Sequence, residues 1–289
     1  MTQPTHTRQW RAPEELKARL QIDTALVRRI LVRFLQDELH KVGFERAVLG
    51  LSGGLDSALS CYLAAEALGP ENVLALRLPY ATSSSESLTD ADAVIESLGV
   101  QSETIEITPI VEPLFERSPE ITSLRKGNIM ARVRMTVIYD RSMAFDALVV
   151  GTSNKTELLL GYGTIFGDLA SAVNPLGDLY KTQIRQLARQ MELPSAVIEK
   201  APSADLIPGQ TDEGDFGFTY EDVDPLLYLL VDERYSPSEA VAAGFAPAFV
   251  DAVLKMMRVN HFKRVMPLIP KLSSRTVTHD FRYLRDWGT

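Results

Sequence analysis

The stretch from Val48 to Leu63 reads VLGLSGGLDSALSCYL, and its polar centre holds two glycines, two serines and an aspartate. The apolar run before this centre is typical of a strand, and the residues after it favour a helix. Glycines at a strand-to-helix turn let backbone N–H groups approach a ligand, and the helix N-terminus adds unpaired donors and partial positive charge. The stretch therefore predicts a site for a phosphate or pyrophosphate.

Asp56 lies within this turn. A carboxylate beside a phosphate is repulsive unless it holds a divalent cation, such as Mg²⁺, that bridges to the phosphate oxygens. The alternative is that Ser52 caps the helix and Asp56 only complements the helix dipole. A bare Gly-Gly turn favours this alternative, whereas the complete hexapeptide SGGLDS at a strand-to-helix junction favours the nucleotide site.

Strands and helices alternate through the first half of the chain. Apolar runs predict strands at Ala47–Leu51, Val73–Leu78, Glu103–Ile107 and Ala147–Gly151, with helical patterns at Ala58–Leu68, Glu86–Leu98 and Gly127–Ala144. This order predicts an α/β fold, a doubly wound and mostly parallel sheet with helices on both faces. Ligands of such folds bind beyond the carboxyl ends of the strands, where SGGLDS lies.

We expect one domain over residues 1–289, with an N-terminal helix at about 15–42 and a helical C-terminal region and tail at about 220–289. Two segments rich in Gly, Asp and Ser/Thr, Ser83–Ser87 and Leu206–Phe218, are expected to be loops. A further helix is expected at Thr182–Met191.

Composition narrows the class of protein. The chain has 289 residues, 45% of them hydrophobic, and a net charge of −8, which suits a globular domain and argues against nucleic-acid binding. Without a long apolar run or an apolar signal in the first dozen residues, we expect no membrane partner and a cytoplasmic location. The single cysteine, Cys61, excludes an internal disulfide and is expected to be packed and inert in its helix.

The SGGLDS motif resembles the pyrophosphate-binding loop of the ATP pyrophosphatase superfamily, whose members cleave ATP to AMP and pyrophosphate. Three further stretches follow, KGNIMARVRM at 126–135, GTSNKTELLLGYGTIFGDLASAVNPLGDLYKTQIRQLA from Gly151, and APSADLIPGQTDE at 201–213. In order and spacing they are similar to ammonia-dependent NAD synthetase. The resemblance extends from Ala47 to about Arg264 and implies an adenine nucleotide α-hydrolase-like fold.

The resemblance also implies roles for individual residues. Asp56 and Glu157 would bind Mg²⁺ and, with Lys181, carry catalysis. The residues that would bind ATP are Gly50, Leu51, Ser52, Gly53, Gly54, Leu55, Asp56, Ser57, Arg77, Thr152, Lys181 and Ser203. The dinucleotide substrate would contact Arg132, Asp168 and Lys263. Taken singly, a lysine or arginine at such positions is more often an ordinary surface residue, so the joint occurrence carries the argument.

The implied reaction is the ATP-dependent amidation of deamido-NAD to NAD. ATP adenylates the carboxylate, ammonia attacks the mixed anhydride, and AMP and pyrophosphate leave. Mg²⁺, the loop amides and Lys181 would neutralise the charge that develops on pyrophosphate. A base that keeps the nitrogen as neutral ammonia could be Asp168 or Asp205. Because the only thiol falls in a helix, no glutaminase domain is expected, and ammonia would be used directly or supplied by a separate subunit.

The sequence departs from the family pattern in two places. Where many members read close to GYFTKYGD, this chain reads GYGTIFGD, so Gly163 replaces an aromatic residue and Ile165 replaces a lysine. The usual His-Lys pair corresponds to Phe262 and Lys263, and the displaced His261 receives no role. The tail cations that could replace the missing lysine are Lys271, Arg275, Arg282 and Arg285.

The resemblance implies a homodimer. The helix at Asn128–Phe145 carries apolar residues around its circumference, a pattern that alone slightly favours a core helix of a monomer. Two other functions stay open from the loop alone. They are another ATP pyrophosphatase amidotransferase, such as a GMP synthetase-like enzyme, and a non-catalytic adenine-nucleotide sensor, which would not need Asp56 and Glu157 together on one rim.

Overall fold

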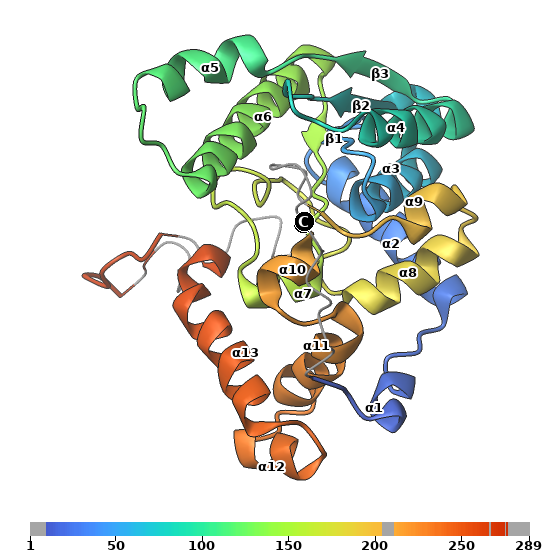
Figure 1. Cartoon of the computed structure of the whole chain (residues 1–289). Coiled ribbons are helices and arrows are strands. Elements are labelled where there is room, and N and C mark those ends of the chain that lie inside the picture. The colour runs from blue at the N-terminus through green and yellow to red at the C-terminus, as the bar shows by residue number, and fades with distance from the viewer. Residues whose placement is uncertain (1–9, 204–210, 266, 275, 277–289) are drawn as a thin grey trace.

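The computed structural model describes residues 10–203, 211–265, 267–274 and 276. The upper part of the molecule in Figure 1 is built around a four-stranded parallel sheet in the order β3-β2-β1-β4. The strands are β1 Ala47–Gly50, β2 Val73–Arg77, β3 Gln101–Thr104 and β4 Leu148–Val149. Beyond β4, a single parallel bridge joins Val150 to Val173. The predicted doubly wound α/β fold is confirmed.

Alternating side chains of β1 feed two cores on opposite faces of the sheet. Ala47 and Leu49 pack into the core beneath helices α2 Thr24–His40, α3 Leu55–Leu68, α4 Ser85–Leu98 and α8 Lys181–Gln190. Val48 packs into the other core, against helices α5 Thr108–Glu116 and α6 Ser123–Phe145. Both faces of the sheet are therefore covered, and its strand ends are left for a site.

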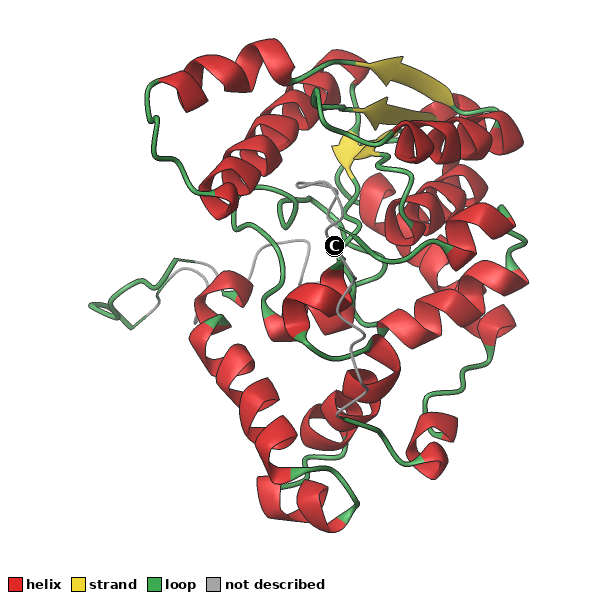
Figure 2. Ribbon diagram, viewed as in Figure 1, coloured by secondary structure: helices red, strands yellow, loops and turns green. Residues whose placement is uncertain are grey.

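A third core lies away from the sheet, among the C-terminal helices (Figure 1). Its helices are α7 Lys155–Leu160, α11 Tyr220–Leu227, α12 Pro237–Ala242 and α13 Pro247–Val259. Short helices complete the chain, as Figure 2 shows, namely α1 Glu14–Ala18, α9 Ser195–Glu199, α10 Asp212–Phe216, the π-helix η2 Tyr228–Asp232 and the 3₁₀ helices η1 Pro70–Asn72 and η3 His261–Arg264. Trp10 stacks on Phe249 and ties the N-terminal segment to this core.

The predicted continuous helix at 15–42 is wrong, because the chain breaks between α1 and α2. Asp23 accepts a hydrogen bond from Leu26 N at 3.0 Å and so caps α2. An aspartate at this position satisfies orphan amides of a new helix, which makes a fresh start favourable where the apolar spacing alone suggested continuity.

The third strand is shifted from its predicted position, since β3 covers Gln101–Thr104 instead of Glu103–Ile107. It is an edge strand with mostly exposed polar side chains, so apolar content did not mark it. Ile107 still packs in the core after Ile105 N and Ile107 N bond to Arg77 O and Pro79 O.

Both predicted loops contain helix. Ser85–Ser87 form the start of α4, whose N-cap is Ser84, and α10 occupies Asp212–Phe216 within the second segment. Ser and Thr at both starts act as N-caps, so the polar composition marks helix ends as well as loops. Residues 206–210 of the second segment, and Asp205, lie outside the described residues.

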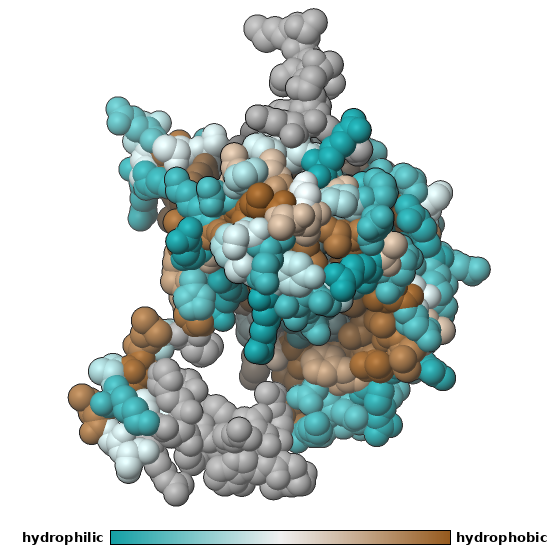
Figure 3. All heavy atoms as spheres, turned by 90° about the horizontal axis from the view of Figure 1, so that it is seen from below, coloured by the Kyte–Doolittle hydropathy of each residue, from teal (hydrophilic) through white to brown (hydrophobic). Residues whose placement is uncertain are grey.

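Surface character agrees with the composition. Hydrophilic residues cover most of the face in Figure 3, with apolar residues in smaller patches between them. None of the helices in the described ranges combines the length and apolar character that a bilayer crossing requires. Cys61 is fully buried in α3, and its burial raises the pKa of the thiol to about 12, which confirms the packed cysteine.

Candidate active site

The SGGLDS segment forms a tight turn between β1 and α3. Gly54 is the N-cap of α3 and offers no side-chain acceptor, so the first-turn amides of this helix have no intrahelical partner. Gly53 adopts φ +79°, and a Cβ there would lie 2.1 Å from the carbonyl oxygen of Ser87. Ser57 Oγ donates to Gly54 O at 3.0 Å and fixes the turn. This geometry suits a bound anion.

The ammonium group of Lys181 lies between two carboxylates at the end of this turn. Lys181 Nζ forms an ion pair with Asp56, and it lies 3.8 Å from Glu157 Oε1. The lysine is 2% exposed, and the side chains of Asp56 and Glu157 are 17% and 15% exposed. The structure thus brings together three residues from distant parts of the chain. The two carboxylates are largely buried, whereas we expected them to be exposed at the rim of the sheet.

Helix α7 holds Glu157 through a capping box. Asn154 Oδ1 accepts from Glu157 N at 2.9 Å, and Glu157 Oε2 accepts from Asn154 N at 3.3 Å. Asn154 is fully buried, and its Nδ2 lies 3.5 Å from Asp56 Oδ1. The Asn-Lys-Thr-Glu sequence is a recognisable capping signal, and it fixes the carboxylate as well as the helix start.

Sequence reasoning missed two members of this site, Asp212 and Tyr220. Tyr220 donates to Asp212 Oδ2 at 2.9 Å, and the Lys181 ammonium lies 5.3 Å from the centre of the tyrosine ring. Asp212 is 4% exposed. Acidic residues inside the otherwise apolar stretch around Tyr220 were the available signal. We call Asp56, Glu157, Lys181 and Asp212 the phosphate cluster.

The phosphate cluster contains three carboxylates and one ammonium group, and this excess of negative charge appears in its pKa values. Burial and the charge of Asp56 raise the pKa of Glu157 well above its usual value. Burial raises the pKa of Asp212 in the same direction. For Lys181, burial opposes the charged form, but Asp56 and Glu157 outweigh it and the pKa is raised. The cluster therefore favours a further cation.

Asp56 and Glu157 fit a Mg²⁺ ion by chemistry, since both are carboxylates and lie in a region of excess negative charge. Within the described residues no group of three or more His, Cys, Asp or Glu side chains forms an all-protein metal site. Mg²⁺ commonly takes one or two carboxylates and completes its shell with water and phosphate oxygens. Two protein ligands next to an anion-binding turn match that pattern.

The three residues implied for the dinucleotide gather on another segment, residues 161–168, which we call the substrate loop. Lys263 Nζ donates to Gly161 O at 2.7 Å and to Gly163 O at 2.9 Å. Arg132, exposed on α6, donates to Ile165 O at 3.4 Å. Asp168 Oδ1 accepts from Thr164 N at 2.7 Å. All three side chains therefore contact the main chain of this loop.

Asp168 is exposed as a residue, but protein atoms surround its carboxyl group, and this desolvation raises the pKa. Desolvation lowers the pKa of Lys263, and Asp168 counteracts it. Of the tail cations, Lys271 lies within the described residues, and Arg275, Arg282 and Arg285 lie outside them. His261 Nδ1 lies 3.2 Å from an Arg264 nitrogen, and Phe262 is 56% exposed.

Three residues implied for ATP come from other parts of the chain than the phosphate cluster. Arg77 forms an ion pair with Asp92 of α4. Thr152 is half-buried and lies three residues after Val149, the last residue of β4. Ser203 is exposed and is the last described residue before the gap at 204–210. The assignment of these residues to ATP therefore stays a prediction.

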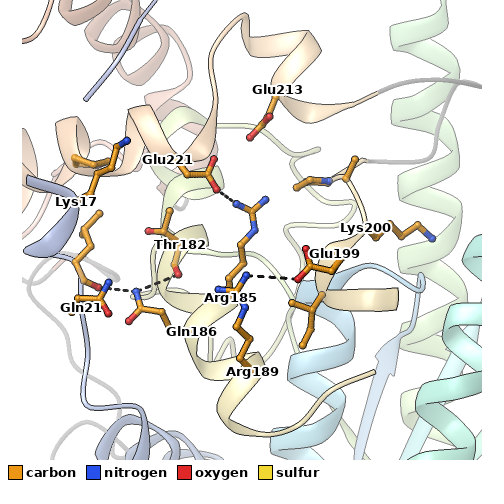
Figure 4. Close-up of a pocket in the computed structure, with 15 residues that line it drawn as sticks. Lys17, Gln21, Thr182, Arg185, Gln186, Arg189, Glu199, Lys200, Glu213 and Glu221 are labelled. Atoms are coloured by element: carbon orange, nitrogen blue, oxygen red, sulfur yellow. Dashed lines mark hydrogen bonds and ion pairs between the residues drawn. The ribbon is translucent and has the colours of Figure 1, made fainter. Parts of the chain in front are cut away.

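A cavity of about 490 Å³ lies beside α8 and contains none of the predicted site residues (Figure 4). Charged side chains line it, and its lysines and arginines have carboxylate partners inside or outside the lining. Arg185 forms an ion pair with Glu221, and Arg189 lies 3.8 Å from Glu199. Since each of these four cations already has a carboxylate partner, the cavity offers little of the positive potential that a phosphate site needs.

Comparison with known proteins gives consistent results. The NAD synthase family model matches residues 27–267. The NH(3)-dependent NAD(+) synthetase of Trichlorobacter lovleyi is 58% identical over 94% of this chain and 99% of its own. Among solved structures, the NMN synthetase of Francisella tularensis has a TM-score of 0.76 at 32% identity over 87% of this chain and 100% of its own. The NH3-dependent NAD synthetase of Campylobacter jejuni has a TM-score of 0.74 at 36% identity over 86% and 100%.

Proposed function

Because the chain belongs to the NAD synthase family, we propose that it converts deamido-NAD and ammonia to NAD, with cleavage of ATP to AMP and pyrophosphate. The observation that carries this proposal is the meeting of Asp56, Glu157 and Lys181 over the amide-rich turn that starts α3. The family match also separates this chain from the GMP synthetase-like alternative.

Each residue of the phosphate cluster has a role in the adenylation step. The amides of the Ser52–Ser57 turn would bind the β- and γ-phosphates, which leave as pyrophosphate. Asp56 and Glu157 would hold Mg²⁺, which supplies charge neutralisation to the phosphate oxygens when bound. Lys181, kept protonated by its carboxylate neighbours, would offset the charge that develops on the leaving pyrophosphate. Because these groups are held in place before the reaction, little reorganisation is needed.

The substrate loop would position the carboxylate that is activated. Lys263 and Arg132 hold loop carbonyls and bring positive charge near the substrate. Desolvation raises the pKa of Asp168. This raised pKa supports a role for Asp168 as the base that keeps the attacking nitrogen as neutral ammonia. Direct use of ammonia is supported by the buried state of Cys61, which leaves it unavailable as a glutaminase nucleophile.

Incubation of the purified chain with ATP, Mg²⁺, ammonium and deamido-NAD tests the proposal. The expected products, identified by mass, are NAD, AMP and pyrophosphate in equal amounts. A parallel reaction with the nicotinate mononucleotide separates this activity from that of the NMN synthetase neighbour. No ATP cleavage in either reaction would indicate a nucleotide sensor, and turnover with glutamine but not with ammonium would contradict direct ammonia use.

We also propose that the protein acts as a homodimer through α6. Only Gly127, Met130, Ala131 and Ser142 of this 23-residue helix are buried in the single chain. Leu124 is 76% exposed and Met143 is 83% exposed. These two residues lie near opposite ends of α6, so the proposal rests on the family resemblance and on how little of this long helix the single chain buries. A mass near 64 kDa in solution is expected from the 32.0 kDa chain, and a mass near 32 kDa at working concentration would contradict the dimer.

A further inference from the structure

We propose that Asp224 is a positioning residue, which joins the first turns of α7 and α8 and thereby holds Glu157 and Lys181 together. This inference rests on the proposed function, because it assigns a role to a residue behind the same site. Asp224 belongs to α11, in the C-terminal part of the chain, and it is fully buried.

Both carboxylate oxygens of Asp224 bind residues adjacent in the chain to the reacting groups. Oδ1 accepts from Thr156 Oγ1 at 2.6 Å, and Thr156 precedes Glu157. Oδ2 accepts from Thr182 N and from Thr182 Oγ1, both at 2.8 Å, and Thr182 follows Lys181. One carboxylate thus binds residues in the first turns of two helices, α7 and α8.

The two helix starts are also linked directly. Thr156 Oγ1 accepts from Lys181 N at 3.1 Å while it donates to Asp224. A hydroxyl group has a single proton to donate and accepts through its lone pairs. Because Thr156 donates that proton to Asp224, the carboxylate fixes the orientation of the lone pairs that accept from Lys181 N. Loss of the carboxylate would free Thr156 and, through it, the backbone of Lys181.

A buried carboxylate such as that of Asp224 is also energetically unfavourable for a contact with a purely structural role. Burial raises its pKa to about 6, although hydrogen bonds from Thr156 and Thr182 favour the ionised form. A neutral side chain in the same place would avoid this desolvation. A carboxylate offers strong acceptor positions in fixed directions, which suits a residue that aligns two catalytic helices.

A second buried aspartate on α11 provides a matched control. Asp222 is 3% exposed, and it accepts from Ala12 N at 3.1 Å and from Thr219 Oγ1 at 2.6 Å. These contacts tie the N-terminal segment to the start of α11 and do not reach α7 or α8. The same Asp→Asn change at position 222 therefore removes a buried charge from the same helix without touching the catalytic pair.

The experiment compares Asp224→Asn, Asp222→Asn and Thr156→Val in the full chain, with kcat and the KM values for ATP and deamido-NAD measured below the melting temperature of each variant. Asp224→Asn is expected to lower kcat about 10- to 100-fold, as loss of supporting contacts does at other catalytic sites, and to raise the KM for ATP, because Lys181 and Glu157 would both face the triphosphate, while the KM for deamido-NAD stays within about threefold. Asp222→Asn is expected to keep kcat within about twofold. The double variant Asp224→Asn/Thr156→Val is expected to lose little more than the worse single variant, because both act through one contact.

An Asp224→Asn variant with the kcat of Asp222→Asn would overturn the inference, and so would equal losses of kcat that follow equal losses of melting temperature. If the unaltered chain makes no NAD, the proposed function fails, and the rise in melting temperature on addition of ATP and Mg²⁺ becomes the readout. Asp224→Asn should then lose this rise while Asp222→Asn keeps it, and the reverse result would refute the positioning role.

Discussion

The phosphate cluster and the substrate loop are built in different ways. In the cluster, side chains contact side chains, and Lys181 is 2% exposed between its carboxylates. Around the substrate loop, side chains contact main-chain groups, as Lys263 does at Gly161 and Gly163, and Arg132 is exposed. Buried charge pairs are strict in geometry, whereas bonds to a main chain tolerate changes in loop sequence.

This difference explains where the chain departs from its family pattern. The departures at Gly163 and Ile165 fall in the substrate loop, whose carbonyls accept the same bonds whichever side chain is present. The SGGLDS turn and Lys181 do not tolerate such sequence changes. Asp56 of the turn and the ammonium group of Lys181 each take the place of water around the buried charge of the other. We infer that ATP chemistry is fixed by side chains and that the fit to the dinucleotide is adjusted in the loop.

The largest expected effect follows from removal of a carboxylate in the phosphate cluster. Asp56→Asn and Glu157→Gln should each lower kcat by about 10²- to 10³-fold, because each removes a group that holds charge at the leaving pyrophosphate. The melting temperature should hold in Glu157→Gln, which removes one of several like charges, and should fall in Asp56→Asn, which removes the ion-pair partner of the buried Lys181. Asp251→Asn, at an exposed position on α13, is the control. Activity above a tenth of the original in both variants would remove the cluster from the mechanism.

Substitution of Gly53 should affect ATP use by about 10- to 100-fold in kcat/KM. Alanine at this position combines a strained φ of +79° with a contact of 2.1 Å to Ser87 O, so the turn must move away from α4. Gly99→Ala is a matched control, because its φ is +66° and a Cβ there meets no atom within 4 Å. Steady-state kinetics with ATP varied distinguish the two, and equal effects would show that strain alone, without displacement of the turn, lowers activity.

Binding of Mg²⁺ without nucleotide should weaken by up to about tenfold for each unit that the pH falls below the raised pKa of Glu157. Burial and Asp56 raise this pKa, so protonation of Glu157 competes with the cation at higher pH than for an ordinary glutamate, and lower pH favours the proton. The rise in melting temperature with Mg²⁺ at a series of pH values measures the effect. A rise in Glu157→Gln as large as in the original chain would contradict the assignment.

The smallest effect is expected at the substrate loop. Lys263→Ala should raise the KM for deamido-NAD by about three- to tenfold and leave the KM for ATP unchanged, because it removes the bonds to Gly161 O and Gly163 O while those of Asp168 and Arg132 still hold the loop. Arg258→Ala, on the exposed side of α13, serves as the control. A large loss of kcat with Lys263→Ala would show that the substrate loop takes part in the chemical step. The proposed difference between this loop and the phosphate cluster would then be wrong.

A local signal in the sequence predicted the SGGLDS turn, which follows from its flanking strand and helix. Glu157 was placed through family resemblance, and the capping box of Asn154 and Glu157, three residues apart, was a local signal for the start of α7 that the sequence analysis did not use. Lys181 was placed through family resemblance. By contrast, Asp212, Tyr220 and Asp224 reach the site only because α11 packs against α7 and α8. No local pattern encodes a contact across 68 residues, which is the separation of Thr156 and Asp224.

The same distinction applies to the fold. The central strands were predicted because they are apolar on both faces, whereas β3 at the edge is polar and was shifted. The break between α1 and α2 depends on a single cap at Asp23 in a pattern that otherwise continues. Strong periodic segments were therefore predictable, and boundaries set by one residue were not.

The burial of Cys61 gives the molecule an internal reporter. It is the only thiol in the chain, and it lies in α3 a few residues after the turn that would receive the triphosphate. A thiol-specific reagent can reach it only when α3 separates from its neighbours, so the labelling rate reports how often that separation occurs. Nucleotide that bridges the turn to Lys181 should slow this labelling, which would let affinity be read from protection without any assay of turnover.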